Sequence, residues 1–161
     1  MPVVDGCVFC RIASGAEPCH LVHEDERHLG FLDIFPNTEA FSVVMTKECL
    51  PSDIARVDGH VAAGLFEAAR RVAVKIAAAY EDVDRCAIVF EGMMIDHLHA
   101  KVIPLHRTVG VQPSPESGTT ARGEQYFEAY PGYVTTEITA SRADDEHLAA
   151  VAAKINSQGR R

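Results

Sequence analysis

The segment with the most chemical potential in this chain runs from 96 to 104 and reads Asp-His-Leu-His-Ala-Lys-Val-Ile-Pro. Side chains on a β-strand alternate between its two faces, so His97, His99 and Lys101 should share one face while the residues between them point into the core. Two imidazoles and an ammonium group side by side suit an anionic ligand or a metal ion. The alternative is a half-exposed edge strand whose polar face carries basic residues without any ligand.

The second chemical feature is the pair Cys7 and Cys10, which has the spacing C-x-x-C. Such a pair is either half of a zinc site or a redox couple. Redox pairs of the thioredoxin type stand at a strand-to-helix junction, and no strand is expected before Cys7. A zinc site needs two more ligands, for which Cys49 and one histidine of the 97–101 segment are candidates. Cys49, like Cys19, could instead be a small buried residue without a ligand role.

The composition of the chain limits the kinds of ligand and partner that these residues could bind. The 161 residues are enough for one domain with a proper core, and the formal net charge of -8 argues against a sequence-independent grip on nucleic acid or an anionic membrane. A small phosphorylated ligand needs only a local positive charge. The five cysteines are an odd number, and no secretory signal or apolar run of ~18 residues is found. We therefore expect a reduced, cytoplasmic protein with neither nucleic-acid nor membrane partners.

The chemical residues need a framework of strands and helices. Short apolar or β-branched segments, separated by turn residues, predict strands at 20–24, 29–34, 41–45, 87–90 and 97–103. A long helix is predicted from an N-cap at Asp58 to about Tyr80, with the apolar stripe Val61, Leu65, Val72 and Ile76. The pattern predicts an α+β domain with an antiparallel sheet and one main helix.

The remainder of the chain reads as an extension of that domain. Residues 107–123 are rich in Pro, Ser and Thr and predict a loop, which an aromatic cluster follows (Tyr126, Phe127, Tyr130 and Tyr133). A C-terminal helix is predicted over 144–155, with an acidic start and with Leu148, Val151, Ala152 and Ile155 on one side. We expect residues 1–107 to form the core, and 108–161 to pack on the same domain.

Several spaced motifs resemble the histidine triad (HIT) family of nucleotide hydrolases and transferases. In order they are 7–12 (C-x-x-C-x-I), 15–18 (G-A-E-P), 22–26 (V-x-E-D-E), 31–36 (F-L-D-I-x-P), Lys47 and 97–104 (H-x-H-x-x-V-I-P). The resemblance extends over about residues 7–106 and implies a five-stranded antiparallel sheet, the HIT-like fold, with a homodimer as the assembly. It also implies cleavage of a nucleotide phosphoanhydride or phosphoramidate at the α-phosphorus, with a purine nucleoside phosphate derivative as substrate.

The resemblance assigns roles to single residues. It implies that His99 is the nucleophile that forms a nucleotidyl intermediate, and that a zinc ion is bound by Cys7, Cys10, Cys49 and His97. Asp33 corresponds to the acceptor of the ribose hydroxyls, and Ile34 to part of the base pocket. A zinc-bound His97 would be held neutral and in a fixed orientation beside the nucleophile, while Lys101 would face the phosphate oxygens as a positive charge.

The chain also departs from the pattern of the family it resembles. Lys101 replaces the third histidine of the triad, Phe90 stands where an amide is usual, and Ala40-Phe41 replaces Gly-His. The usual G-Q-S/T stretch is reduced to 93–96, Met-Met-Ile-Asp. Phosphate binding would then depend on backbone N–H groups, on Lys101 or on the extension, where His106, Arg107 and the tyrosines could reach a site or could simply pack or face solvent.

Two other functions remain open at the level of sequence. One is a nucleotide-binding protein with weak or lost catalysis, which senses or sequesters its ligand; the missing amide and hydroxyl groups favour it, and the presence of His99 opposes it. The other is a zinc-stabilised interaction module in which His99 and Lys101 have no chemical task. An adduct on His99 would separate the enzyme from both.

Overall fold

The computed structural model describes residues 6–110, 126–129 and 141–157. Its sheet has five antiparallel strands in the order β1-β2-β3-β5-β4. The strands are β1 Leu21–Glu24, β2 His28–Leu32, β3 Ser42–Thr46, β4 Cys86–Val89 and β5 His99–Pro104. The helices are α1 Val8–Ala13, α2 Gly59–Ala79 and α3 Asp145–Ser157, with a 3-10 turn at Ile54–Arg56. The predicted α+β class, the five-stranded sheet, the main helix and the C-terminal helix are confirmed.

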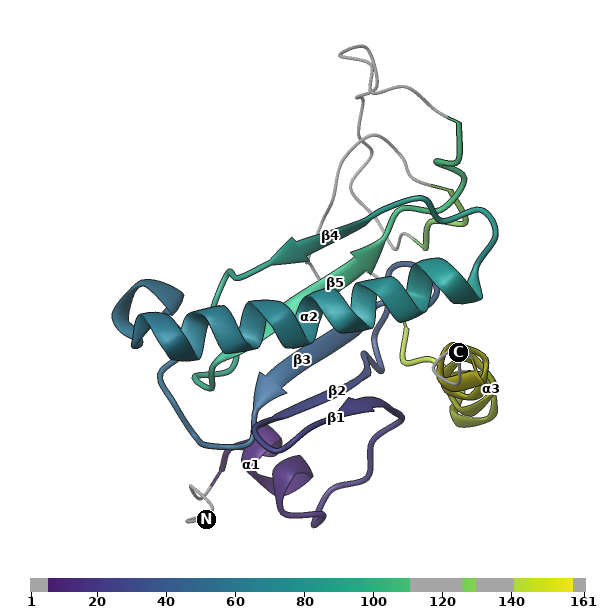
Figure 1. The fold of residues 1–161 in the computed structure, drawn as a ribbon. Helices are drawn as coiled ribbons and strands as arrows, with labels where there is room; N and C mark the ends of the chain where they lie inside the picture. The colour runs from purple at the N-terminus through teal and green to yellow at the C-terminus, as the bar shows by residue number, and fades with distance from the viewer. Residues whose placement is uncertain (1–5, 111–125, 130–140, 158–161) are drawn as a thin grey trace.

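Helix α2 lies across one face of the sheet (Figure 1). It begins where predicted, because the Asp58 carboxylate accepts a hydrogen bond from the backbone N–H of His60 at 2.8 Å. Its apolar stripe is buried against β3 and β5, with Leu65, Val72 and Ile76 fully enclosed. None of the helices in the described part of the chain is long and apolar enough to cross a membrane.

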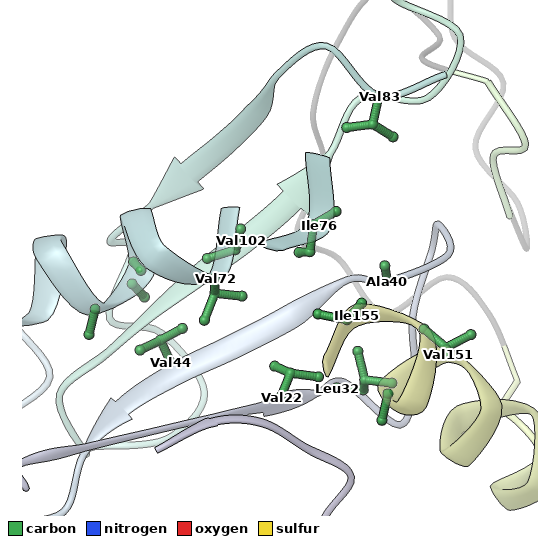
Figure 2. Close-up of a cluster of buried hydrophobic side chains, with 14 of the residues drawn as sticks. Val22, Leu32, Ala40, Val44, Val72, Ile76, Val83, Val102, Val151 and Ile155 are labelled. Carbon is green, nitrogen blue, oxygen red and sulfur yellow. The ribbon is translucent and has the colours of Figure 1, made fainter. Parts of the chain in front are cut away.

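The main core fills the space between the sheet, α2 and α3 (Figure 2). Val44 of β3 and Val102 of β5 face Val72 of α2 there, and Val151 and Ile155 bring α3 into the same cluster. The C-terminal helix therefore completes the core instead of standing apart from it. Burial of each such side chain stabilises the fold by about 1.5–3 kcal/mol.

The opposite face of the sheet carries α1 and a smaller apolar cluster. Phe9 of α1 packs there on Phe31, Val43 and Met45. The strand register pairs Met45 with His99 and Val43 with Lys101, so the alternation of β5 places these two polar side chains on the α1 face. The prediction that His99 and Lys101 share one face of this strand is confirmed, whereas His97 precedes the strand.

Two details differ from the sequence expectations. Helix α1 was not predicted, because its six residues are too few to show a helical period. Strand β5 begins at His99 rather than at His97, because the N–H of His97 donates to the carbonyl of Ile95 at 2.8 Å and holds a bend there. Most of the expected loop at 107–123, as well as Tyr130 and Tyr133, lies outside the described residues.

Candidate active site

A cavity of about 340 Å³ opens on the α1 face of the sheet. Its lining is mainly apolar and brings together α1, β2, the loop that follows β2, the segment 93–95 and two side chains of β5. The lining residues are Val8, Phe9, Ile12, Glu17, Pro18, Cys19, Phe31, Leu32, Asp33, Ile34, Phe35, Asn37, Phe41, Val43, Met93, Met94, Ile95, His99 and Lys101. Four residues predicted from sequence, at 33, 34, 99 and 101, therefore share one cavity.

His99 is 3% exposed, and its orientation is fixed by a backbone contact. Its Nδ1 lies 2.7 Å from the carbonyl oxygen of His97. Because a carbonyl can only accept, Nδ1 carries the proton and Nε2 carries the lone pair. The ring of Phe9 contacts the imidazole edge-on, with 5.3 Å between centroids. Burial lowers the pKa of His99, and the charge of Lys101 adds to this effect, although the contact with the His97 carbonyl opposes it.

Lys101 lies beside His99 on the same face and is almost fully buried. Its ammonium group forms an ion pair with the carboxylate of Glu91, which follows β4. Glu91 is not predicted from the sequence, because its contact joins two residues across the β4–β5 connection without a recognisable spacing. The expected positive charge is therefore present in the cavity, but a carboxylate already neutralises it.

Asp33 and Ile34 line the cavity at the end of β2. The carboxylate of Asp33 accepts a hydrogen bond from the N–H of Phe35 at 2.8 Å. Burial raises the pKa of Asp33, while that hydrogen bond and the charges of Lys101 and His99 act in the opposite direction. Ile34 is partly exposed at the rim. Both positions fit the roles that the family resemblance implies, a hydroxyl acceptor and an apolar wall.

The loop after β2 is fixed from outside by the C-terminal extension. The N–H of Phe127 donates to the carbonyl of Asn37 at 2.7 Å, and the hydroxyl of Thr38 donates to the carbonyl of Phe127 at 2.9 Å. On the other side, the N–H of Ala143 donates to the carbonyl of Ile34 at 2.8 Å. The extension thus contacts the cavity loop near both of its ends, and no sequence pattern predicts these contacts.

The four predicted metal ligands form one cluster. The ligand atoms of Cys7, Cys10, Cys49 and His97 all lie within 4.8 Å of one another. His97 Nδ1 is 3.5 Å from the sulfur of Cys7 and 3.6 Å from that of Cys10. A tetrahedral zinc ion with ordinary Zn–S and Zn–N bonds requires a sulfur–nitrogen separation of ~3.5 Å. The donor set and its spacing therefore fit zinc.

The histidine of this cluster has the correct tautomer for a ligand. His97 Nε2 lies 2.7 Å from the carbonyl oxygen of Thr46, so Nε2 carries the proton. The lone pair of Nδ1 then faces the sulfurs, and the backbone contact fixes the ring as an outer-shell partner does in known metal sites. Burial lowers the pKa of His97, which favours the neutral form that binds metal.

His106 and Arg107 do not line the cavity. The ring of His106 lies 3.2 Å from the carboxylate of Asp82 and 3.1 Å from the carbonyl of Glu39, with Tyr80 packed against it. Arg107 pairs with Glu128 of the extension at 3.4 Å. Of the uses considered from sequence, the structure therefore shows packing for His106 and exposure to solvent for Arg107, and it places neither in the cavity.

Comparison with known proteins places the chain in a family. A model of the HIT domain matches residues 14–108, more than half of the chain. An uncharacterized HIT-like protein of Methanocaldococcus jannaschii is 43% identical over 42 residues, 26% of this chain and 33% of that protein. The adenosine 5'-monophosphoramidase hnt1 of Schizosaccharomyces pombe is 26% identical over 98 residues, 61% of this chain and 73% of that protein.

The solved structures agree on the fold. A Zn-bound histidine triad family protein from Mycobacterium smegmatis has a TM-score of 0.65 and 21% identity, with 95% of this chain and 92% of that chain covered. The match to the Methanocaldococcus protein spans only a third of that protein's length.

The family match, the five-stranded sheet and the H-x-H segment together show that this chain belongs to the HIT family.

Proposed function

We propose that this chain is a nucleotidyl hydrolase or transferase that acts at the α-phosphorus of a nucleotide through a nucleotidyl-His99 intermediate. The observation that supports it best is the contact between His99 Nδ1 and the His97 carbonyl, which leaves the Nε2 lone pair for attack within a cavity that Asp33 also lines. The name of the fission yeast relative, a monophosphoramidase, supports the same chemistry.

The proposed reaction has two steps, formation of the nucleotidyl-His99 intermediate and its hydrolysis. His99 Nε2 attacks phosphorus, a P–N bond forms, and the bond to the leaving group breaks with its electron pair on that group. An amine leaving group then takes a proton from water. In the second step water attacks phosphorus, the P–N pair returns to His99, and a nucleoside monophosphate is released together with one proton. A different acceptor in place of water makes the enzyme a transferase.

Lys101 acts on the charge of the phosphoryl group. Its ammonium lies on the same face as the nucleophile, two residues further along β5, and its partner Glu91 holds it in the cavity. A fixed cation stabilises the oxygens as charge develops on them. Asp33 accepts the ribose hydroxyls, and the apolar wall with Ile34 takes the base, for which we propose a purine.

The zinc ion would have a structural task. Cys7 and Cys10 of the α1 region, Cys49 after β3 and His97 before β5 would hold it, and the ion would link three separate segments next to the nucleophile. Its bond to His97 Nδ1 would keep that residue in place, and with it the carbonyl that orients His99. The chemistry at phosphorus belongs to the protein side chains.

A second candidate is a nucleotide-binding protein with weak or lost catalysis. Segment 93–96 offers no hydroxyl or amide side chain, and the charge of Lys101 is balanced by Glu91. Turnover distinguishes the two. The purified protein should cleave at least one member of a panel of nucleoside phosphoramidates and dinucleoside polyphosphates, and His99→Ala should cleave none. Tight binding without turnover across the panel would support the sensor instead.

A further inference from the structure

Two large methionines stand at the mouth of the cavity. Met93 is 66% exposed and Met94 69% exposed, yet both line the same cavity as His99 and Lys101. Ile95, next along the chain, lines it as well. Residues 93–95 therefore form an apolar lip of the described cavity, on a different segment from the loop at 33–37 that would hold the nucleoside. The lip begins two residues after Glu91, whose carboxylate pairs with Lys101.

The lip is held in place by its surroundings. The hydroxyl of Ser52 donates to the carbonyl of Gly92 at 2.8 Å, and the N–H of Ser52 donates to the carboxylate of Asp96 at 3.0 Å. Gly92 has φ +64°, and a Cβ at that position would lie 2.7 Å from the Ser52 carbonyl oxygen. Met94 has φ +74°, a left-handed conformation that costs a residue with a side chain. The exposed side chains are thus presented by a fixed loop.

The charges around the cavity restrict what can lie on this lip. Among the described residues that line the cavity, Lys101 is the only lysine or arginine, and it is paired with Glu91. The lining also contains the carboxyl groups of Glu17 and Asp33. A polyphosphate leaving group would bring several negative charges that no free cation in this lining offsets.

We infer that the leaving group of the substrate is uncharged and apolar, and that it lies against the lip formed by Met93 and Met94. This inference rests on the proposed function and narrows it. The substrate class is a nucleoside 5'-phosphoramidate of an apolar amine, whose phosphoryl centre carries one negative charge. The P–N bond to the amine breaks as His99 attacks, the amine keeps the electron pair and takes a proton from water, and the free amine leaves over the lip.

The test compares two amides of similar chemical reactivity. Adenosine 5'-phosphoramidates of ethylamine and of 2-phenylethylamine differ mainly in apolar surface, and diadenosine tetraphosphate represents the charged alternative. We expect kcat/KM for the phenylethyl compound to exceed that for the ethyl compound by roughly 10- to 100-fold, the range for added apolar contact in a pocket. It should also exceed that for diadenosine tetraphosphate.

Variants of the lip test whether Met93 and Met94 cause the preference for the phenylethyl compound. Met93→Gln and Met94→Gln keep the length of the side chain but remove its apolar character, so each should lower the phenylethyl-to-ethyl ratio of kcat/KM, and the double variant should bring it near one. Val109→Gln changes another exposed apolar residue, one that does not line the cavity, and it should keep the wild-type ratio. Both methionines are exposed, so the variants should fold.

Three results would overturn the inference: equal kcat/KM for the two amides, faster cleavage of diadenosine tetraphosphate, or an unchanged ratio in the double variant. Failure of the proposed function looks different, because none of the three compounds would then be cleaved. In that case the binding affinities of the two uncleaved amides still test the inference. A lip that binds apolar groups should bind the phenylethyl compound more tightly than the ethyl compound, and equal affinities would contradict the inference.

Discussion

The Nδ1 atom of His99 donates a hydrogen bond to the backbone carbonyl of His97 at 2.7 Å, and this contact links the cavity to the cluster of proposed metal ligands. His97 is fixed in turn by Thr46, at 2.7 Å from its Nε2, and it faces the sulfurs of the proposed zinc site through Nδ1. The residue that would bind metal is therefore the residue that orients the nucleophile. Loss of the metal should disturb His99 without any change to His99 itself.

The first prediction concerns Cys49, one of the four proposed zinc ligands. Cys49→Ala removes one of four ligands, so the purified protein should lose most of its zinc and melt at a lower temperature. Cys49→His should keep one zinc per chain, because imidazole is an equally good ligand. Metal analysis and thermal unfolding with and without a chelator measure both effects. Cys19→Ala, whose sulfur is outside the cluster, is the control.

A tetrahedral site with Zn–S near ~2.3 Å and Zn–N near ~2.0–2.1 Å is the geometry that X-ray absorption should report. Protein that keeps a full equivalent of tightly bound zinc after Cys49→Ala would exclude Cys49 as a ligand.

The second prediction concerns Lys101. If its task is electrostatic, Lys101→Ala should lower kcat by roughly 10- to 1,000-fold, the range for removal of one transition-state donor. The shape of the pH profile should stay the same, because no titrating proton donor is lost. Lys101→Arg should recover part of the rate. A shift of the alkaline limb in Lys101→Ala would instead identify a general acid, and full activity would show that Lys101 has no role.

The third prediction concerns the support of the cavity loop by the C-terminal extension. Thr38→Val removes the hydroxyl that donates to the Phe127 carbonyl at 2.9 Å, and so it removes one of the contacts between the cavity loop and the extension. Because Thr38 follows Asn37 in the cavity loop, KM should rise about 3- to 10-fold with a smaller change in kcat. Thr38→Ser keeps the hydroxyl and should restore KM. Equal KM and kcat for Thr38→Val and the wild type would show that the Thr38–Phe127 contact does not affect substrate binding.

The fourth prediction is a pH dependence of stability at the β1–β2 turn. Partial burial of Asp25 opposes its ionisation, but hydrogen bonds from the N–H groups of Arg27 and His28 and from the ring of His23 outweigh it and lower the pKa from 3.8 to about 2. A carboxyl whose pKa is depressed on folding stabilises the protein above the unfolded pKa, and this contribution disappears as the pH falls to the folded pKa.

Asp25→Asn should therefore lower the free energy of unfolding by on the order of 1–2 kcal/mol at pH 6, and by much less near pH 2. Chemical denaturation at the two pH values measures the difference. Glu81→Gln, at an exposed position, is the control. A penalty for Asp25→Asn that is as large at pH 2 as at pH 6 would contradict the assignment.

The fifth prediction is a homodimer, which the family resemblance implies. The outer face of helix α2 carries exposed apolar side chains, among them Phe66 at 49% and Val74 at 55% exposure, which a second copy would cover. Light scattering at micromolar concentration should report twice the chain mass of 17.5 kDa. A particle of a single chain mass under these conditions would rule the dimer out.

Some residues of the site could be predicted from the sequence, namely those that recur at a short, regular spacing along the chain. Alternation along β5 placed His99 and Lys101 on one face, and the C-x-x-C spacing led to Cys7 and Cys10, which the structure brings next to His97. The partners that tune the site could not be found in this way. Phe9 lies on a helix too short to show a period, and Glu91 contacts Lys101 through a turn whose path depends on Ser52.

The apolar lip illustrates the same limit. In the sequence, segment 93–96 has no hydroxyl or amide side chain, which indicates only that phosphate binding depends on other groups or that catalysis is weak or lost. The structure shows that Met93 and Met94 line the cavity from a loop with left-handed backbone at Gly92 and Met94. Such a conformation depends on contacts with residues some forty positions away, so it leaves no local signal in the sequence.

The central claim is the covalent intermediate on His99. Purified protein mixed with an adenosine 5'-phosphoramidate, quenched within one turnover and digested, should yield a peptide with adenylate attached to His99 by a bond that is labile in acid. The same treatment of His99→Ala should give none. Turnover by the wild-type protein without any adduct on His99, or turnover that persists in His99→Ala, would contradict this account.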